Sequence, residues 1–386
     1  MKIRLIRSNN PRPSTTTSEL GFGRYFADHM FMMDYGADEG WHDARIVPYG
    51  TLDLEPANLT LHYGQTIFEG LKAYRWADGS VRIFRVRDHA ERFLRSAKRL
   101  CMPAFDPAFV ADAWKALVHV DSAWVPSKPN TSLYLRPSLI AADNLLGVRP
   151  ASRYLMYVIT SPVGNYYSRG ASPTRILVEN TFSRATDGGL GDVKTAANYA
   201  ASLLAAEKAK KAGFDQVLWL DAKEHRYVEE VGTMNIFFVI DDVLVTPPLK
   251  GTILDGITRR TVLELAREWG IPCEERRLEI AEVVEASRAG TLQEVFGSGT
   301  AATISPIGEL NYNGQAIIIE EREDSLRKRF FEAIVGICYG THPDNHGWIT
   351  PVDEAGSVLE SVDEEEHEDY LNGSGRGESM RAIDVP

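Results

Sequence analysis

The pattern of apolar and polar positions predicts strands and helices in succession along most of the chain. Residues 81–84 alternate as a strand with one buried face does, and residues 87–100 then place apolar side chains three and four positions apart, as a helix does. Residues 155–159 indicate another strand, and no stretch of the sequence repeats another. This succession is typical of an α/β chain.

The second half of the chain continues the pattern. Helices are expected over residues 195–212 and 258–269, because each stretch is rich in helix formers and is followed by a glycine. Short apolar runs between these helices predict strands over residues 217–220, 226–231 and 235–240.

A stretch rich in glycine, proline and serine, residues 161–173, is the best candidate for a connection between two domains. The length of 386 residues is sufficient for two domains with full cores. We therefore expect an N-terminal extension over residues 1–20, a small α/β domain over 21–166, a linker over 167–180, a large domain over 181–350 and an acidic, disordered tail over 351–386.

The net charge of −12 is concentrated at the C-terminal end. Residues 351–386 hold eleven acidic residues and two arginines, a net charge of −9, with few apolar residues. This composition predicts a solvated tail, and we expect its removal to leave the activity nearly unchanged. The rest of the chain is close to neutral and has no basic stripe, which argues against nucleic-acid binding.

The cysteines and the N-terminal residues indicate the cellular compartment in which the protein is expected. The nine histidines do not cluster, and the cysteines have no paired spacing, so neither a metal site nor a disulfide scaffold is indicated. No apolar run is long enough to span a bilayer. The first 20 residues carry three arginines, but Pro11 and Pro13 would interrupt the amphipathic helix of a transit peptide. We expect a cytoplasmic rather than an organellar protein. The three cysteines are Cys101, Cys273 and Cys338.

One lysine, Lys194, stands where a glycine-rich loop, residues 187–191, meets the expected helix over residues 195–212. The N–H groups at the start of a helix disfavour a further positive charge nearby, and this helps to keep an amine neutral and nucleophilic. The alternative is a solvated surface lysine, which is the commoner case for lysines in general.

Two nucleotide-binding motifs do not fit the glycines of this chain. Val193 stands where a phosphate-binding loop needs a glycine before its lysine. Residues 297–302 match a loose dinucleotide-binding pattern, but Pro306 would break the helix that must follow it. What remains at residues 297–302 is a turn of small residues whose N–H groups are suited to a phosphate or a carboxylate.

An acid, Glu230, stands immediately before the apolar strand expected over residues 235–240. Alone it is more simply a solvated glutamate at a sheet edge, since glutamates are rarely buried without a partner. Together with Lys194 it suggests pyridoxal phosphate, whose aldehyde needs a lysine and whose ring nitrogen stays protonated beside an anion.

Four stretches of the sequence closely resemble the branched-chain amino acid aminotransferases, which are fold-type IV pyridoxal-phosphate enzymes. These stretches are residues 61–74, 134–137, 230–237 and 296–301, and they occur in the order of the family. The resemblance spans about residues 21–348. It implies a mixed α/β (α+β) fold with a small α/β domain and a larger domain with a barrel-like sheet. It also implies a homodimer with its active site near the subunit interface.

The resemblance implies the cofactor, pyridoxal 5′-phosphate, and its ligands. Lys194 corresponds to the lysine that forms a Schiff base with the aldehyde, and Glu230 to the partner of the ring nitrogen. Tyr199 corresponds to the side chain that hydrogen-bonds the phenolic oxygen. The other implied ligands hold the phosphate or pack on the ring. The full implied set is Arg85, Lys194, Tyr199, Glu230, Leu254, Ile257, Thr258 and Thr300.

The implied substrates are L-leucine, L-isoleucine or L-valine with 2-oxoglutarate, and the reaction is reversible. Arg136 corresponds to the residue that receives the side-chain carboxylate of glutamate, although a structural salt bridge is the alternative. Val148 corresponds to a residue supplied by the other subunit. The aromatic members, taken singly, are as compatible with ordinary packing. The full implied set is Phe22, Tyr63, Phe68, Tyr134, Arg136, Val148, Tyr166, Thr233, Thr300 and Ala301.

Other functions stay open at this point. D-amino-acid aminotransferases and aminodeoxychorismate lyases share the fold, the lysine and the glutamate, and an inactive relative could serve as a binding protein. The chain also departs from some relatives: residues 302–305 lack their Cys-x-x-Cys pair, and Asp255 stands where many have proline. Thiol regulation at residues 302–305 is therefore not expected.

Overall fold

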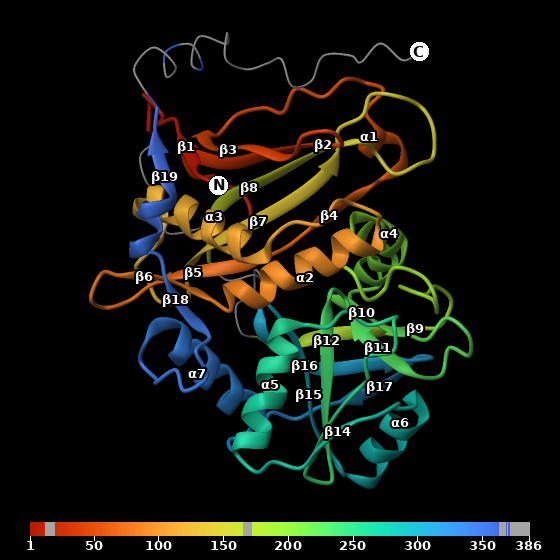
Figure 1. Cartoon of the computed structure of the whole chain (residues 1–386). Coiled ribbons are helices and arrows are strands. Elements are labelled where there is room, and N and C mark those ends of the chain that lie inside the picture. Colours follow the sequence, from red (N-terminus) through yellow and green to blue (C-terminus); the bar gives the residue numbers. More distant parts are fainter. Residues whose placement is uncertain (12–19, 165–171, 363–367, 369, 371–386) are drawn as a thin grey trace. The chain divides into compact units, whose positions relative to one another are not determined.

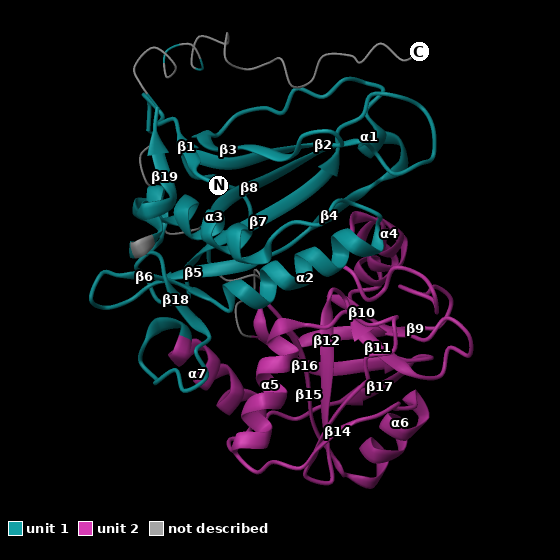
Figure 2. Ribbon diagram, in the orientation of Figure 1, with its two compact units in different colours: residues 1–165, 338–386 teal, residues 166–337 magenta. Residues whose placement is uncertain are grey.

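The structure is a computed structural model that describes residues 1–11, 20–164, 172–362, 368 and 370 (Figure 1). The chain forms two compact units (Figure 2). Unit 1 consists of residues 1–165 and 338–386, and unit 2 of residues 166–337. Unit 1 is therefore built from both ends of the chain, and unit 2 is one continuous segment.

Unit 1 contains a ten-stranded sheet whose two edges are both supplied by the C-terminal segment. Strand β18 pairs with β6 at one edge, and β19 runs parallel to β1 at the other. Strand β4 (Thr66–Phe68) pairs with β7 beside the main path. The order across the sheet is β18 (Ile349–Pro351), β6 (Val81–Phe84), β5 (Leu71–Arg75), β7 (Ser132–Ala141), β8 (Arg153–Val163), β2 (His29–Gly36), β3 (Gly40–Pro48), β1 (Ile3–Leu5) and β19 (Leu359–Ser361).

Two helices of unit 1, α2 (Val86–Arg99) and α3 (Pro107–Val120), cover one face of this sheet (Figure 1). Their apolar faces supply side chains such as Phe93 and Trp114, both fully buried, to a core shared with the sheet. Asp106 and Pro107 start α3, since the Asp106 carboxylate accepts a hydrogen bond from the Ala108 N–H. The shorter helices are α1 (Leu59–Tyr63), η1 (Ser122–Trp124) and η2 (Asp353–Val358).

Unit 2 contains a nine-stranded sheet in which six strands close into a barrel, because β11 pairs with both β10 and β12. The barrel-like sheet expected from the sequence is confirmed. Strands β13 (Val243–Thr246) and β14 (Cys273–Glu275) continue the sheet beyond β12, and β17 (Gln315–Ile318) pairs with β16. The barrel strands, in order, are β11 (Val228–Val231), β10 (Gln216–Leu220), β9 (Thr174–Glu179), β16 (Thr303–Tyr312), β15 (Leu292–Gly299) and β12 (Met234–Ile240).

Helix α4 packs on the outside of this barrel, where Ala205 and Ala209 contact Val217 and Trp219 of β10. Alanines at this spacing allow the helix to approach the strand closely. No helix within the described residues is long and apolar enough to cross a membrane. The helices of unit 2 are α4 (Ala196–Lys211), α5 (Ile257–Glu268), α6 (Ile280–Ala289) and α7 (Leu326–Tyr339), the last of which ends in unit 1.

The structure differs from the expected segments at both ends of the chain. Residues 3–5 are not part of a separate extension, since they form β1 within the sheet of unit 1. The expected tail begins too early, because residues 351–361 complete β18 and form η2 and β19. Val352 and Ala355 are buried in the core, although acidic neighbours surround them in the sequence. The local charge concealed the few apolar residues that anchor this segment.

Candidate active site

Lys194 and Tyr199, which the sequence placed in one site, meet at the start of helix α4. The Lys194 Nζ donates a hydrogen bond to the Tyr199 hydroxyl at 2.5 Å. The Asn198 side chain donates to the carbonyl oxygens of Leu190 (2.7 Å) and Val193 (2.9 Å), which ties the glycine-rich loop to the first turn of the helix. The lysine is therefore held at a fixed junction rather than on a free loop.

Glu230 is buried on β11, with 3% of its surface exposed, and both of its carboxylate oxygens have partners. Oε1 accepts from the Leu254 N–H (2.9 Å) and from the Asn235 side chain (3.2 Å). Oε2 lies 3.0 Å from the Nε of Arg184. Burial raises the pKa of Glu230 above its ordinary value, although the Arg184 charge, the Leu254 N–H and the Lys194 charge partly offset it.

A β-bulge places a second acid beside Glu230. Leu218 pairs with Val231 and Leu220 with Val228, so Glu229 and Glu230 together oppose one residue of β10. Val228 and Val231 both pack in the barrel core, and the two glutamates lie outside it. Glu229 is also buried, and its Oε1 accepts a hydrogen bond from the Thr252 hydroxyl at 2.5 Å.

The start of helix α5 offers backbone N–H groups to an anion. Ile257 and Thr258 are its first residues, and their N–H groups have no acceptor within the helix. Gly256 precedes them and has no side chain that could cap the helix. A Cβ at Gly256 would overlap the Asn235 side chain, so glycine is required for the loop to pass this point. Such a helix start is suited to a phosphate.

Two turns lie together at one end of the barrel. Thr233 is in the turn between β11 and β12, and Thr300 and Ala301 are in the turn between β15 and β16. Asn235 pairs with Ser298 across β12 and β15, which makes these turns neighbours. Glu230 pairs with Asn235 at the same end. The turns therefore present their polar groups close to the buried acid.

Unit 1 holds a second group of the expected residues. The Phe22 ring lies edge-on to the Tyr134 ring, with centroids 4.9 Å apart. The Arg136 guanidinium lies 4.8 Å from the centre of the Phe68 ring and donates to the Tyr134 hydroxyl at 3.0 Å. Gly70 is required here, because a Cβ would overlap that hydroxyl. The result is an apolar wall that contains one cation.

The other expected residues of unit 1 lie elsewhere. Arg85 is buried at the start of α2 in the left-handed region (φ 51°), with its Nε 2.7 Å from Asp88. Tyr63 is 42% exposed and Val148 is 87% exposed, so both side chains are accessible in this chain. Tyr166 lies outside the described residues.

The sequence reasoning missed the residues that support Glu230 in the structure. Arg184 and Asn235 both contact its carboxylate. Arg184 lies in the segment before the glycine-rich loop, and Asn235 lies in a recognised stretch, but neither position carries a local sign of its partner. An asparagine five residues after a buried acid, across a two-residue turn, is the one signal available, since a hairpin brings such residues opposite each other.

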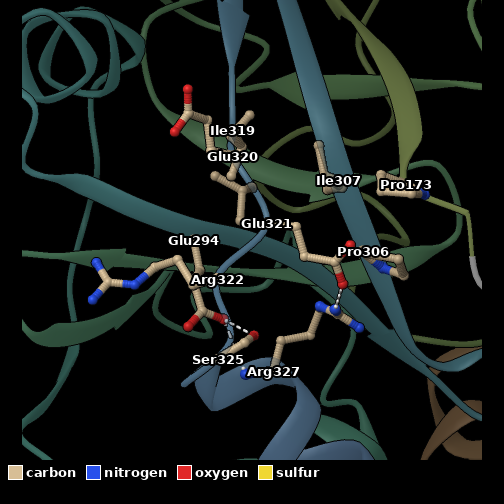
Figure 3. Close-up of a pocket in the computed structure, with 11 residues that line it drawn as sticks. Pro173, Glu294, Pro306, Ile307, Ile319, Glu320, Glu321, Arg322, Ser325 and Arg327 are labelled. Carbon is tan, nitrogen blue, oxygen red and sulfur yellow. Dashed lines mark hydrogen bonds and ion pairs between the residues drawn. The ribbon is translucent and has the colours of Figure 1, made fainter.

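A separate pocket in unit 2 contains none of the expected residues (Figure 3). Glu294, one of the glutamates that line this pocket, accepts hydrogen bonds from the Ser325 hydroxyl (2.8 Å) and from the N–H groups of Leu326 (2.8 Å) and Arg327 (3.0 Å). Glu294 therefore caps helix α7, and its role is structural. No group of three potential metal ligands is assembled among the described residues.

The sequence pattern of the family described as amino-transferase class IV matches residues 66–310. The chain belongs to this family, which makes it a pyridoxal-phosphate-dependent aminotransferase. The residues of unit 2 fit that cofactor. A lysine bonded to a phenol suits an aldehyde, a buried acid suits a protonated pyridine nitrogen, and the helix start suits a phosphate.

Relatives of known name are similar over most of the chain. The chain is 47% identical over 351 residues to "Branched-chain-amino-acid aminotransferase 2" of Bacillus subtilis, which covers 91% of this chain and 97% of that protein. It is 49% identical over 337 residues to "Branched-chain-amino-acid transaminase 1" of the same organism, which covers 87% of this chain and 95% of that protein.

Solved structures are similar as well. The branched-chain aminotransferase of Thermoproteus uzoniensis with norvaline has a TM-score of 0.70 at 28% identity, covering 84% of this chain and 99% of that chain. The branched-chain amino acid aminotransferase from Escherichia coli has a TM-score of 0.67 at 28% identity, covering 84% of this chain and 99% of that chain.

Proposed function

We propose that this enzyme transfers the amino group of L-leucine, L-isoleucine or L-valine to 2-oxoglutarate, reversibly. The names of its relatives support this choice. The observation that carries it is the position of Arg136 against the rings of Phe68 and Tyr134. An apolar wall suits an aliphatic side chain, and one cation in it suits the carboxylate of the second substrate.

The proposed cofactor ligands of unit 2 divide by the part of the cofactor that they meet. Pyridoxal phosphate supplies an aldehyde that condenses with amines and a protonated ring that takes up an electron pair. Lys194 would bind the aldehyde carbon, Glu230 would face the ring nitrogen and Tyr199 would donate to the phenolic oxygen. N–H and hydroxyl groups of Ile257, Thr258 and Thr300 would hold the phosphate, and Leu254 would pack on the ring. Arg85 is a further proposed phosphate ligand.

Lys194 has a second proposed task. With a substrate amino acid bound, the Lys194 Nζ would take the proton from the substrate α-carbon and return it. Tyr199, bonded to the same Nζ at 2.5 Å, keeps the amine in position. Glu230 keeps the ring nitrogen protonated, and its burial makes that charge effective.

The proposed substrate ligands also divide in two. Thr233 and the N–H groups of Thr300 and Ala301 bind the α-carboxylate, since both turns lie at one end of the barrel. Phe22, Phe68, Tyr134 and Arg136 meet the side chain, together with Tyr63 and Tyr166.

We further propose a homodimer in which Val148 contributes to the site of the other subunit. Leu146 and Val148 are 68% and 87% exposed, which is unusual for two apolar residues so close in sequence. The three free cysteines fit a reducing compartment, and we propose the cytoplasm.

The proposed substrate class is tested by the visible absorption of the bound cofactor. L-leucine and L-glutamate should each convert the absorption band in a single half-reaction, and D-alanine should not. Conversion by D-alanine alone would support a D-amino-acid aminotransferase. No conversion by any amino acid would support an inactive binding protein.

The lysine is tested by Lys194→Ala. We expect this variant to lose the covalent absorption band and to lower turnover by on the order of 10³-fold or more, because one amine provides both attachment and proton transfer. The far-ultraviolet circular dichroism should be unchanged. Lys208→Ala is the matched control, since Lys208 lies on the same helix against the Phe182 ring. Full turnover in Lys194→Ala would contradict the assignment.

A further inference from the structure

The β-bulge of β11 places two carboxylates, those of Glu229 and Glu230, where either one could carry the negative charge. Glu229 and Glu230 are adjacent and both buried, and their carboxylates both accept hydrogen bonds from the segment over residues 252–254, Glu229 from the Thr252 hydroxyl and Glu230 from the Leu254 N–H. Two neighbouring carboxylates in a site of low polarity do not both ionise readily, because each charge disfavours the other. The cofactor requires an anion at one defined position, so some feature of the protein must decide which acid carries the charge.

The partners of the two acids differ. Glu230 has a cation in contact, with the Arg184 Nε 3.0 Å from its Oε2, and two N–H donors on its Oε1. Glu229 has the Thr252 hydroxyl on its Oε1, and its Oε2 has no hydrogen-bond partner among the residues that the structure describes. A guanidinium and two N–H donors stabilise an anion far more than one hydroxyl does.

Arg184 is itself held in place. Its side chain is 8% exposed, and its Nη2 donates to the carbonyl oxygens of Gly191 (3.0 Å) and Thr252. A Cβ at Gly191 would overlap the Thr252 carbonyl, so this contact requires glycine. The glycine-rich loop before Lys194 therefore fixes one end of the guanidinium, and the Nε lies at ion-pair distance from Glu230, 3.0 Å from its Oε2.

We propose that Arg184 is a positioning residue that keeps Glu230, and not Glu229, ionised and oriented toward the ring nitrogen of the cofactor. Arg184 reaches the reaction only through Glu230. This inference rests on the proposed role of Glu230.

The charges around the two acids agree with this assignment. Burial raises the pKa of Glu229, the Thr252 hydroxyl and the Arg184 charge offset this only in part, and the charges of Asp221 and Asp187 add smaller increases. The charged groups that act on Glu230 are Arg184, Glu229 and Lys194. Without Arg184, burial would act on Glu230 with only the N–H donors and Lys194 to oppose it, so the folded pKa of Glu230 would rise further.

The experiment uses the holoenzyme and compares Arg184→Met, Arg184→Lys, Glu230→Gln and the double variant Arg184→Met/Glu230→Gln. Three quantities are measured: the pH dependence of the cofactor absorption without substrate, the dissociation constant of pyridoxal phosphate, and kcat and KM as functions of pH. Arg175→Met is the matched control, since Arg175 pairs with Glu309 at an exposed site of the same unit.

In Arg184→Met we expect the acidic limb of kcat and the spectral transition to move to higher pH by about one unit or more, as loss of a neighbouring cation does. On this acidic limb the shift lowers kcat by about tenfold or more, with a smaller change in KM and weaker cofactor binding. Arg184→Lys should return the transition close to its wild-type pH, because it keeps the charge. If Arg184→Met does not fold, Arg184→Gln takes its place: a shift to higher pH supports the proposal, and no shift overturns it.

The double variant separates a positioning role from a structural one. If Arg184 acts through Glu230, Arg184→Met should add little to the loss in Glu230→Gln. Two fully additive losses, or a spectral transition that stays at its wild-type pH, would overturn the inference while leaving the proposed function intact. Unchanged turnover and absorption in Glu230→Gln alone would instead overturn the role of Glu230. Glu229→Gln should behave as wild type, and a spectral shift there would assign the charge to Glu229.

Discussion

The Arg136 side chain places one positive charge within an aromatic surface, and this determines what the pocket can accept. Its guanidinium lies 4.8 Å from the Phe68 ring centre and 5.3 Å from that of Tyr134. The ring faces stabilise this cation, so we expect it to stay in place when an aliphatic side chain is bound and to pair with a carboxylate when an acidic substrate is bound.

Replacement of this cation should separate the two substrates. In Arg136→Leu we expect the efficiency of the glutamate half-reaction to fall by about 30-fold or more, because an unpaired carboxylate in such a site costs about 2 kcal/mol or more. The leucine half-reaction should change much less. Each half-reaction is measured separately by the absorption change of the bound cofactor, since a complete assay uses both substrates.

The control for this variant is Arg82→Leu, which removes a guanidinium that lies 4.0 Å from the Trp76 ring centre in the same unit. Both half-reactions of Arg82→Leu should match wild type. Equal losses of the two half-reactions in Arg136→Leu would mean that Arg136 has a structural role and that this pocket recognises the two substrates in another way.

At the residue scale, the sequence predicted pairs that are close along the chain better than pairs that are not. Lys194 and Tyr199 are five residues apart across a helix start, and the structure joins them. Arg184 and Glu230 are joined only because a loop and a bulged strand meet. No periodicity encodes that contact, and the bulge itself has no signature in the letters around Glu229.

At the scale of elements, a buried ionic network joins β4 to helix α2. Glu69 follows β4 and is fully buried, and its carboxylate accepts from Arg92 (2.6 and 2.9 Å), His89 (2.9 Å) and the Gly70 N–H (3.0 Å). Burial alone would raise the pKa of Glu69, but the Arg92 charge and the hydrogen bonds from His89 and Arg92 hold it well below its ordinary value.

Removal of this charge should destabilise unit 1. Glu69→Gln leaves the Arg92 guanidinium buried without its anion, and we expect a loss of about 3–5 kcal/mol near neutral pH. Because the folded pKa is depressed, the contribution of Glu69 is complete above the ordinary carboxyl pKa of 4.5 and decreases as the pH falls toward the folded value. Urea unfolding of wild type and variant near neutral pH and at about pH 4 and below measures both effects.

Glu91→Gln is the control, since Glu91 is an exposed residue of the same helix. Its unfolding should match wild type at every pH. A difference between wild type and Glu69→Gln that grows as the pH falls would contradict the depressed pKa.

The elements themselves were largely predictable where their hydrophobic pattern is long. The strand expected over residues 81–84 has those bounds, and the helix expected over 87–100 spans 86–99. The sequence did not predict strands β18 (Ile349–Pro351) and β19 (Leu359–Ser361), because three-residue strands carry too little hydrophobic pattern and acidic residues lie close to them. Their stability comes from pairing with β6 and β1, which lie far away in sequence.

At the scale of the whole molecule, the C-terminal segment is part of the sheet of unit 1, and this changes what truncation should do. Ending the chain after Pro351 removes η2, β19 and the buried side chains of Val352 and Ala355. We expect lower thermal stability, since burial of one valine alone contributes about 1.5 kcal/mol or more. The expectation from composition concerned the activity and treated residues 351–386 as one solvated segment.

A chain that ends after Tyr370 is the matched control, because it keeps every described residue and removes only residues 371–386, whose two arginines and two acids carry no net charge. Its melting temperature and kcat should match the full chain. Equal stability of the two truncated chains would show that β19 and η2 contribute nothing, and an inactive chain ending at Tyr370 would assign a role to residues 371–386.

The pairing of β18 with β6 and of β19 with β1 also sets an order of events during synthesis on the ribosome. The first 165 residues emerge with both edges of their sheet open, and unit 2 is then made before the two closing strands. At typical translation rates this interval lasts roughly 10–40 s. Unit 2 is continuous and can fold within it. The edge strands of nascent unit 1 stay unpaired until residue 361 has emerged, and we expect chaperones to bind unit 1 during this interval.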